Sequence, residues 1–111
     1  MSAAVPAKGD FVSFFSGGQA GHEQKGRRPA LVISNGSFNK LTGIAFVCPI
    51  TNADRGYPFH IAIPPGHKVS GVVMADQLKA VDYKERKFAF LAQAPTGLLD
   101  EVLGVIGRII N

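Results

Sequence analysis

The residues with the clearest chemical potential lie in residues 16–28, SGGQAGHEQKGRR. Glu23 can act as a general base or acid. Arg28 can hold a phosphate bidentately and offset charge that develops in a transition state. Pro29 follows, so the backbone of Arg28 is biased toward an extended conformation that aims its side chain reproducibly. A base beside an arginine fits attack of a ribose 2′-hydroxyl on its own phosphodiester, and RNA carries that nucleophile whereas DNA does not.

The sequence offers no metal-binding constellation beside this segment. The three histidines are not spaced as ligands, no acidic cluster is present, and the single cysteine, Cys48, excludes a cysteine-based zinc site and an internal disulfide. We therefore expect no metal and no cofactor. The alternative is a solvated glycine-rich loop without a chemical role. A nucleotide-binding loop is rejected, because residues 17–21 lack the following helix and the Gly-Lys-Ser/Thr ending.

The length and the net charge of the chain narrow the range of possible functions. The 111 residues predict one domain, 1–111, and 46% hydrophobic with 18% charged residues is a globular composition. Of the net charge of +4, residues 1–60 carry +3, from six basic and three acidic residues. This excess suggests a polyanionic partner, the alternative being a mildly basic surface. Residues 44–50 are too short an apolar stretch to span a membrane, and no secretory signal is readable, so we expect a cytoplasmic protein.

Short apolar runs separated by glycine and proline predict a small β-rich fold. Strands are expected at residues 10–15, 29–34, 44–49, 59–63, 72–74, 78–81 and 88–92, with a helical turn at 37–41. From Leu98 the period becomes helical, and Thr96 is the expected N-cap. Gly104 and Gly107 would leave a smooth helix face, open to close approach by a second subunit. The predicted class is mainly β (α+β), an antiparallel barrel with a C-terminal α-helix.

Several motifs of this sequence together resemble those of one known protein family. Residues 21–34, GHEQKGRRPALVIS, contain the pattern Gly-x-Glu-Gln-x-Gly-x-Arg-Pro followed by a hydrophobic strand, and residues 39–43, 49–51, 56–59 and 71–79 add further matches in the same order. In these segments the chain resembles the MazF/PemK family, the ribosome-independent mRNA interferases of toxin–antitoxin systems. The Gly-Tyr-Pro-Phe and Ala-Asp-Gln-x-Lys segments resemble the MazF branch more than the Kid/PemK branch.

The resemblance implies a PemK/CcdB-like (SH3-like) barrel that works as a symmetric homodimer. It implies metal-independent cleavage of single-stranded RNA (mRNA) within short motifs, leaving a 2′,3′-cyclic phosphate and a 5′-hydroxyl and inhibiting translation and growth. It also implies a cognate antitoxin, whose acidic, poorly ordered segment occludes the RNA groove.

Three positions take the catalytic roles of the family. Glu23 is expected to transfer the proton of the 2′-hydroxyl, Arg28 to hold the scissile phosphate, and Thr51 to donate to a non-bridging oxygen or orient the phosphate. The group that protonates the leaving 5′-oxygen is left open between Glu23 and its neighbour His22.

The chain departs from the family pattern at one position. The Kid/PemK branch has a catalytic arginine two residues before the aspartate of the Asp-Gln pair, and here that residue is Met74. Asp76 is therefore expected to have a structural or RNA-contacting role.

Further residues are candidates for RNA contact. Phosphate contacts are expected from Lys25, Arg27, Arg55 and Lys79, and base-edge contacts from Gln24, Asn52 and Gln77. For each lysine or arginine the alternative is a solvated surface charge. Tyr57 could stack a base, whereas alternation with Ile61 and Ile63 predicts a core-facing Phe59. Cys48 is expected to be a buried small hydrophobe.

Two other functions fit the same fold. One is a CcdB-like, non-enzymatic inhibitor of DNA gyrase, and the other is a non-catalytic RNA-binding barrel. The intact Glu-Gln-x-Gly-x-Arg-Pro run and the presence of Thr51 favour the endoribonuclease.

Overall fold

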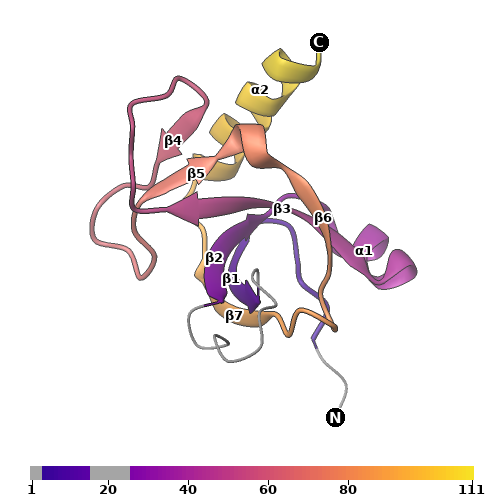
Figure 1. Cartoon of the computed structure of the whole chain (residues 1–111). Helices are drawn as coiled ribbons and strands as arrows, with labels where there is room; N and C mark the ends of the chain where they lie inside the picture. The colour runs from indigo at the N-terminus through magenta and orange to yellow at the C-terminus, as the bar shows by residue number, and fades with distance from the viewer. Residues whose placement is uncertain (1–3, 16–25) are drawn as a thin grey trace.

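Runs of β-branched and aromatic residues, bounded by glycine and proline, form the strands of this protein. In the computed structural model, which describes residues 4–15 and 26–111, they build a seven-stranded antiparallel sheet (Figure 1). The strands are β1 (Asp10–Phe15), β2 (Arg27–Val32), β3 (Ile44–Thr51), β4 (His60–Ala62), β5 (Val72–Met74), β6 (Lys79–Asp82) and β7 (Ala89–Gln93). The helical elements are α1 (Gly36–Thr42), the 3-10 turn η2 (Ala75–Gln77) and α2 (Leu98–Ile110).

β3 is the strand around which the sheet is organised. One of its edges pairs with β2, and the other pairs first with β6 and then, through Ile50 and Thr51, with β5. The turn η2 connects β5 to β6, so it lies where the neighbour of β3 changes. The end of β3, the beginning of β2 and η2 therefore meet in one region.

The sheet curls without closing among the described strands. Its order is β4-β5-β3-β2-β1-β7, with β6 paired to β3 outside this path. The chain between β6 and β7 bridges to β1 instead, where the carbonyl of Arg86 accepts a 2.9 Å hydrogen bond from the amide of Phe15. The predicted class, mainly β with a C-terminal helix, is confirmed as an open curled sheet rather than a closed barrel.

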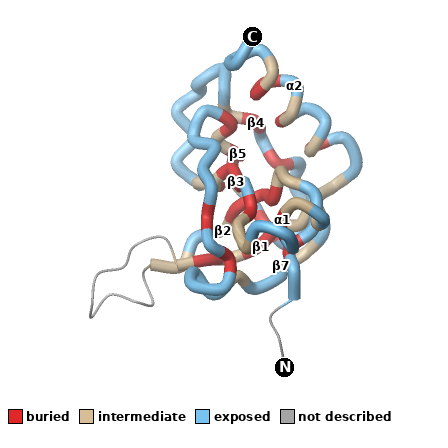
Figure 2. The backbone as a smooth tube through the Cα atoms, turned by 90° about the vertical axis from the view of Figure 1, so that its right-hand side faces the viewer, coloured by how far each residue is buried: buried red, intermediate tan, exposed pale blue. Residues whose placement is uncertain are grey.

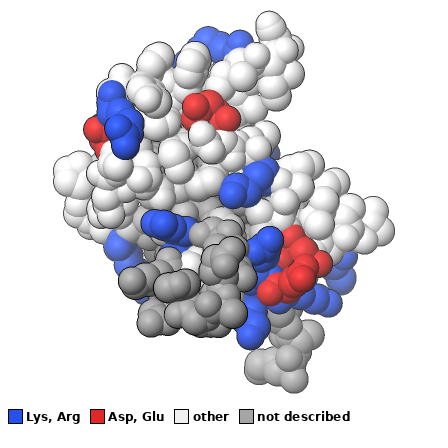
Figure 3. All heavy atoms as spheres, in the orientation of Figure 1, with Lys and Arg blue, Asp and Glu red and all other residues white. Residues whose placement is uncertain are grey.

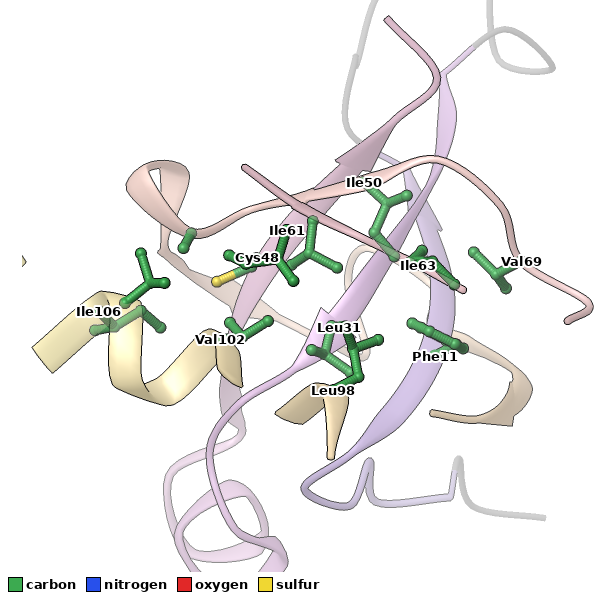
Figure 4. Close-up of a cluster of buried hydrophobic side chains, with 13 residues drawn as sticks. Phe11, Leu31, Cys48, Ile50, Ile61, Ile63, Val69, Leu98, Val102 and Ile106 are labelled. Atoms are coloured by element: carbon green, nitrogen blue, oxygen red, sulfur yellow. The ribbon is translucent and has the colours of Figure 1, made fainter. Parts of the chain in front are cut away.

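Two hydrophobic clusters occupy the two faces of this sheet. In the first, Leu31 and Cys48 pack with Leu98, Val102 and other residues of α2, as Figure 4 shows. The second fills the inside of the curl and consists of Val12, Phe14, Ala30, Val32, Ala45, Val47, Val81 and Tyr83. Successive residues of a strand face opposite sides, and burial on both sides explains the continuous hydrophobicity of β2. Figure 2 shows the buried backbone running through the middle of the molecule.

The helix boundaries differ from the sequence prediction at one end of α2. The N-cap is Gly97 (φ +90°) and not Thr96, and no side chain caps the helix. Gly97 has a left-handed backbone conformation that glycine adopts easily and that does not belong to an α-helix. The helix therefore begins after Gly97, one residue later than expected. At the other end Ile109 and Ile110 follow the helical spacing but are exposed, 44% and 71%. In the described chain, no helix has both the length and the apolar character needed to cross a membrane.

Two predictions near the candidate site are also corrected. Arg27 and Arg28 were expected in the loop, but they are the first two residues of β2. Arg27 pairs with Phe15 of β1, and Arg28 pairs with Phe14. Phe59 is not in the core; its side chain is 43% exposed. It precedes β4 in a turn, closed by a 3.1 Å hydrogen bond from the amide of His60 to the carbonyl of Tyr57, so strand alternation does not reach it.

Candidate active site

Arg28 and Thr51 line one pocket although they come from motifs far apart in the sequence. The antiparallel pairing of β2 and β3 sets Ala30 opposite Pro49. Arg28 lies two residues before Ala30 and Thr51 two residues after Pro49, so both lie at this end of the strand pair. The pocket has a volume of about 310 Å³ and is lined by Phe14, Arg28, Pro49, Ile50, Thr51, Met74, Gln77 and Lys79. We call it the Arg28–Thr51 pocket.

The hydroxyl of Thr51 is oriented by its own loop. Its Oγ1 accepts a 3.1 Å hydrogen bond from the amide of Ala53, which leaves the O–H hydrogen available to donate outward. Gly71, beside Thr51 across the β3–β5 pair, has φ +116°. A side chain there would overlap the Thr51 carbonyl, so glycine permits the close approach that holds the end of β3.

The two neighbouring arginines of β2 have different surroundings. The guanidinium of Arg27 donates to the side chain and carbonyl of Ser13, the shortest contact being 2.6 Å, and to the carbonyl of Lys87 at 2.9 Å. It also lies 4.8 Å from the centre of the Phe15 ring. Arg28 is exposed, and its guanidinium has no hydrogen-bond partner within the described part of the chain. With respect to the described residues, Arg28 thus keeps its donors available for a ligand, whereas most donors of Arg27 are engaged.

A second pocket adjoins the first. It has a volume of about 280 Å³ and is lined by Ser13, Arg27, Arg28, Pro29, Asn52, Lys68, Val69, Ser70 and Leu91. We call it the flanking pocket. Arg28 lines both pockets, so they are neighbours around one guanidinium.

The charge of both pockets is positive. No aspartate or glutamate is among the described residues that line either of them. Lys79 lies over the ring of Phe14, with its Nζ 5.8 Å from the ring centre. Figure 3 shows basic side chains at many places on one face of the molecule and acidic side chains at fewer places. Such cationic hollows attract a polyanion, and charge-assisted hydrogen bonds from Arg28 suit a phosphate.

The remaining candidates lie apart from these pockets or beyond the described residues. Arg55 and Tyr57 are exposed in the loop between β3 and β4. That loop contains an Asp54 side chain that accepts a 2.8 Å hydrogen bond from the Gly56 amide. Glu23, Gln24 and Lys25 lie outside the described residues, so their predicted roles stay predictions.

Asp76 faces His60 and is not among the residues that line the Arg28–Thr51 pocket. Its Oδ1 lies 3.5 Å from Nε2 of His60, whose side chain is only 6% exposed. Tyr57 packs on the same imidazole, with ring centres 5.1 Å apart. His60 therefore joins the loop between β3 and β4 to η2, whose last residue, Gln77, does line the pocket.

The described residues contain no group of three histidine, cysteine or carboxylate side chains that could hold a metal ion. Burial, and to a smaller extent the charge of Asp76, raises the pKa of the Cys48 thiol from 9.0 to about 12. Cys48 is fully buried, as predicted, and belongs to the core.

Sequence reasoning missed Lys68 and Ser70, and it included Gly71 in a family motif without assigning it a role. The available signal was the glycine-bounded turn between the predicted strands 59–63 and 72–74. Because β5 pairs with β3, that turn ends beside Thr51 and Asn52. The pairing of these two strands could not be derived from their hydrophobic pattern alone.

The fold is a small α+β domain, an open curled sheet with a C-terminal helix, and it carries a cationic pocket where β2 begins and β3 ends. The comparison with protein families places this domain in the class of type II toxin–antitoxin toxins. The family described as PemK-like, MazF-like toxin of type II toxin–antitoxin systems matches residues 8–110, and the chain belongs to it. The family predicted from the motifs is confirmed.

Named relatives support this membership. The endoribonuclease PemK of Escherichia coli is 36% identical over 96 residues, which cover 83% of this chain and 72% of PemK. The endoribonuclease toxin MazF of Escherichia coli K12 is 36% identical over 86 residues, covering 78% of this chain and 77% of MazF. A solved MazE–MazF structure from Deinococcus radiodurans superposes with a TM-score of 0.87 at 38% identity and covers 98% of both chains.

Proposed function

We propose that this protein is the toxin of a type II toxin–antitoxin system and that it cleaves single-stranded RNA (mRNA) at a short sequence motif. The observation that carries the proposal is the convergence of Arg28 and Thr51 on one cationic pocket. Two relatives, each 36% identical to this chain, are named endoribonucleases. Cleavage of mRNA would inhibit translation and growth.

The proposed reaction uses the 2′-hydroxyl of the substrate as the nucleophile. Its oxygen forms a bond to phosphorus while the bond from phosphorus to the 5′-oxygen breaks, which gives a 2′,3′-cyclic phosphate and a 5′-hydroxyl. Glu23, proposed from the sequence motif and outside the described residues, accepts the proton of the 2′-hydroxyl. The leaving 5′-oxygen takes up a proton from the protonated Glu23 or from its neighbour His22, so one proton is accepted and one is donated in the reaction.

Arg28 and Thr51 bind the phosphate in this scheme. The guanidinium of Arg28, which no other described residue engages, offsets the charge that accumulates on the non-bridging oxygens, and the hydroxyl of Thr51 donates to one of them. Arg27, held by Ser13 and the Lys87 carbonyl, keeps β1 and β2 in register beside the site and adds positive charge. The reaction needs only acid–base and phosphate-binding groups, so we propose that it proceeds without a metal ion.

The partners follow from the same assignment. The solved MazE–MazF structures that this chain resembles support a cognate antitoxin, and we propose that its acidic segment covers the two cationic pockets. We further propose that residues 1–111 act as one cytoplasmic domain, that the working form is a homodimer, and that Gln24, Lys25, Arg55, Tyr57, Asp76, Gln77 and Lys79 contact RNA or support its contacts.

The test is cleavage of a long single-stranded RNA by the purified protein in EDTA, with cut sites mapped by primer extension. A matched RNA with a 2′-O-methyl group at the mapped position should stay intact, because its nucleophile is blocked. The new 3′-fragments should be phosphorylated directly by polynucleotide kinase, as 5′-hydroxyl ends require. Cleavage of the methylated RNA, or inhibition of gyrase supercoiling without RNA cleavage, would contradict the proposal.

A further inference from the structure

The flanking pocket has no role in the phosphate chemistry, yet it shares Arg28 with the Arg28–Thr51 pocket. A group bound in the flanking pocket would therefore lie next to the phosphate that Arg28 holds. In single-stranded RNA, the group next to a phosphate is a nucleotide whose base is free of pairing. The position of the flanking pocket thus suits one base beside the cleaved bond.

The lining of the flanking pocket suits a planar ring with a polar edge. Pro29, Val69 and Leu91 supply apolar surface, and Val69 is only 6% exposed. Asn52 and Ser70 supply polar atoms that can contact a base edge. Sequence-specific RNA-binding proteins read unstacked bases with such a combination of flat apolar contact and edge hydrogen bonds.

Hydrogen-bond donors predominate in this lining. Ser70 Oγ lies 3.4 Å from Oδ1 of Asn52, and the hydroxyl donates to this amide oxygen. The amide nitrogen of Asn52 is left to donate to a ligand. Arg28 and Lys68 have donors and no acceptors. Acceptor groups of a base therefore find partners here, whereas an exocyclic amine finds few.

The walls of the flanking pocket are fixed relative to the Arg28–Thr51 pocket. A Cβ at Gly71 would overlap the carbonyl oxygen of Thr51 and lie 3.0 Å from Oδ1 of Asn52. The backbone after Ser70 is thus packed tightly against the residues that follow β3. A preformed pocket of this kind loses little entropy when it binds.

We propose that the flanking pocket binds the base adjoining the cleaved phosphodiester and selects bases with carbonyl acceptors, guanine or uracil, over adenine. On its Hoogsteen edge guanine offers only acceptors, O6 and N7, and its amine lies on another edge; uracil has the acceptors O2 and O4 and no exocyclic amine. The Hoogsteen edge of adenine presents an exocyclic amine that competes for the scarce acceptors. This inference rests on the proposed endoribonuclease function and deepens it by naming a specificity determinant.

The test uses an RNA pool randomised around a mapped cut site, with cleaved products sequenced. For the wild-type protein we expect guanine or uracil at one position flanking the cut. Asn52→Asp replaces the amide donor by an acceptor, so that preference should fall about tenfold or more, the size expected for the loss of one edge hydrogen bond, while the other motif positions stay unchanged. Asn111→Asp, which places the same new charge at the exposed end of α2, is the matched control and should keep the wild-type preference.

Ser70→Ala provides a milder second variant if Asn52→Asp fails to fold. It frees the amide oxygen of Asn52 to accept from a base, so the preference against adenine should weaken. Wild-type cleavage with neither guanine nor uracil favoured on either side of the cut would overturn the inference, as would unchanged preferences in both variants. A wild-type protein that cuts no RNA would instead contradict the proposed function, so the two failures are distinguishable.

Discussion

Gly71 packs so closely against the carbonyl oxygen of Thr51 that any side chain at position 71 would overlap it. The next residue, Val72, pairs with Thr51 in the sheet, so this contact lies at the beginning of the β3–β5 pairing. The backbone of Gly71 has φ +116°, which L-residues with a side chain rarely adopt. The placement of Thr51 in the Arg28–Thr51 pocket therefore depends on the absence of a side chain at position 71.

Gly71→Ala should destabilise the protein and impair RNA cleavage. The backbone strain alone costs about 1–3 kcal/mol, and the overlap with Thr51 adds to it by displacing the end of β3. Urea denaturation would measure the unfolding free energy, and cleavage at a mapped site would measure activity. Gly66→Ala is the control, because its φ is +90° but its Cβ would meet open space. The proposed role of the Gly71–Thr51 contact would be contradicted if Gly71→Ala and Gly66→Ala lost the same unfolding free energy and both still cleaved RNA.

Much of the fold could be predicted because the strands obey local rules. β1 and β5 have the predicted bounds, and the other strands begin or end within two residues of expectation. The closure of the sheet could not be predicted, since it depends on whether residues 83–88 pair with a neighbour across the curl. The prediction that Phe59 faces the core was wrong for a related reason. Phe59 alternates with Ile61 in the sequence, but β4 begins only at His60, so the side-chain alternation of a strand does not apply to Phe59.

The candidate site was predictable in part. Arg28 and Thr51 were identified through motifs, and both lie just beyond the Ala30–Pro49 pair that ends the β2–β3 pairing, which explains why they line one pocket. The neighbouring Arg27 shows the limit of such reasoning, because its bonds to Ser13 follow from the β1–β2 pairing and not from its residue type. Lys68 was missed because the path of a turn is set by the strands on either side of it.

The two neighbouring arginines should respond differently to mutation. Arg28→Ala removes a guanidinium without a described partner, so we expect cleavage to fall about 100-fold or more while stability changes by less than about 0.5 kcal/mol. Arg27→Ala removes hydrogen bonds to Ser13 and to the Lys87 carbonyl and should cost about 1.5–3 kcal/mol of stability.

Thermal or urea unfolding and single-turnover cleavage would separate these two effects. Arg28→Lys extends the test, because lysine keeps the charge but loses the bidentate geometry, and it should restore cleavage only in part. An Arg28→Ala protein that folds and cuts RNA at the wild-type rate would remove Arg28 from the mechanism.

The thiol of Cys48 should be inert in the folded protein. Burial and the charge of Asp76 raise its pKa from 9.0 to about 12, so the thiolate is scarce at pH 8. A thiol-reactive chromophore should label it slowly in buffer and rapidly in guanidinium chloride. Between about pH 9 and about pH 12 the unfolded chain releases this proton while the folded chain keeps it, so the contribution of Cys48 to stability falls as pH rises. Fast labelling of the native protein at pH 8 would contradict this assignment.

Lys79 should contribute to RNA affinity without contributing to sequence preference. Its ammonium group lines the Arg28–Thr51 pocket and lies over Phe14, where it can meet a backbone phosphate. A phosphate contact gives binding energy that all sequences share, and its removal reduces the release of counterions. For Lys79→Gln we expect weaker binding to every RNA tested and a salt dependence of log K shallower by about 0.7 for each phosphate that is no longer neutralised.

Fluorescence anisotropy with a 2′-O-methylated, uncleavable RNA at several KCl concentrations would measure this slope. Lys40→Gln is the control, since Lys40 is exposed on α1 and lines none of the pockets around Arg28. It should leave the slope of the wild-type protein unchanged. If Lys79→Gln and Lys40→Gln shift the slope equally, Lys79 acts only through net charge, and the assignment of a phosphate contact to it fails.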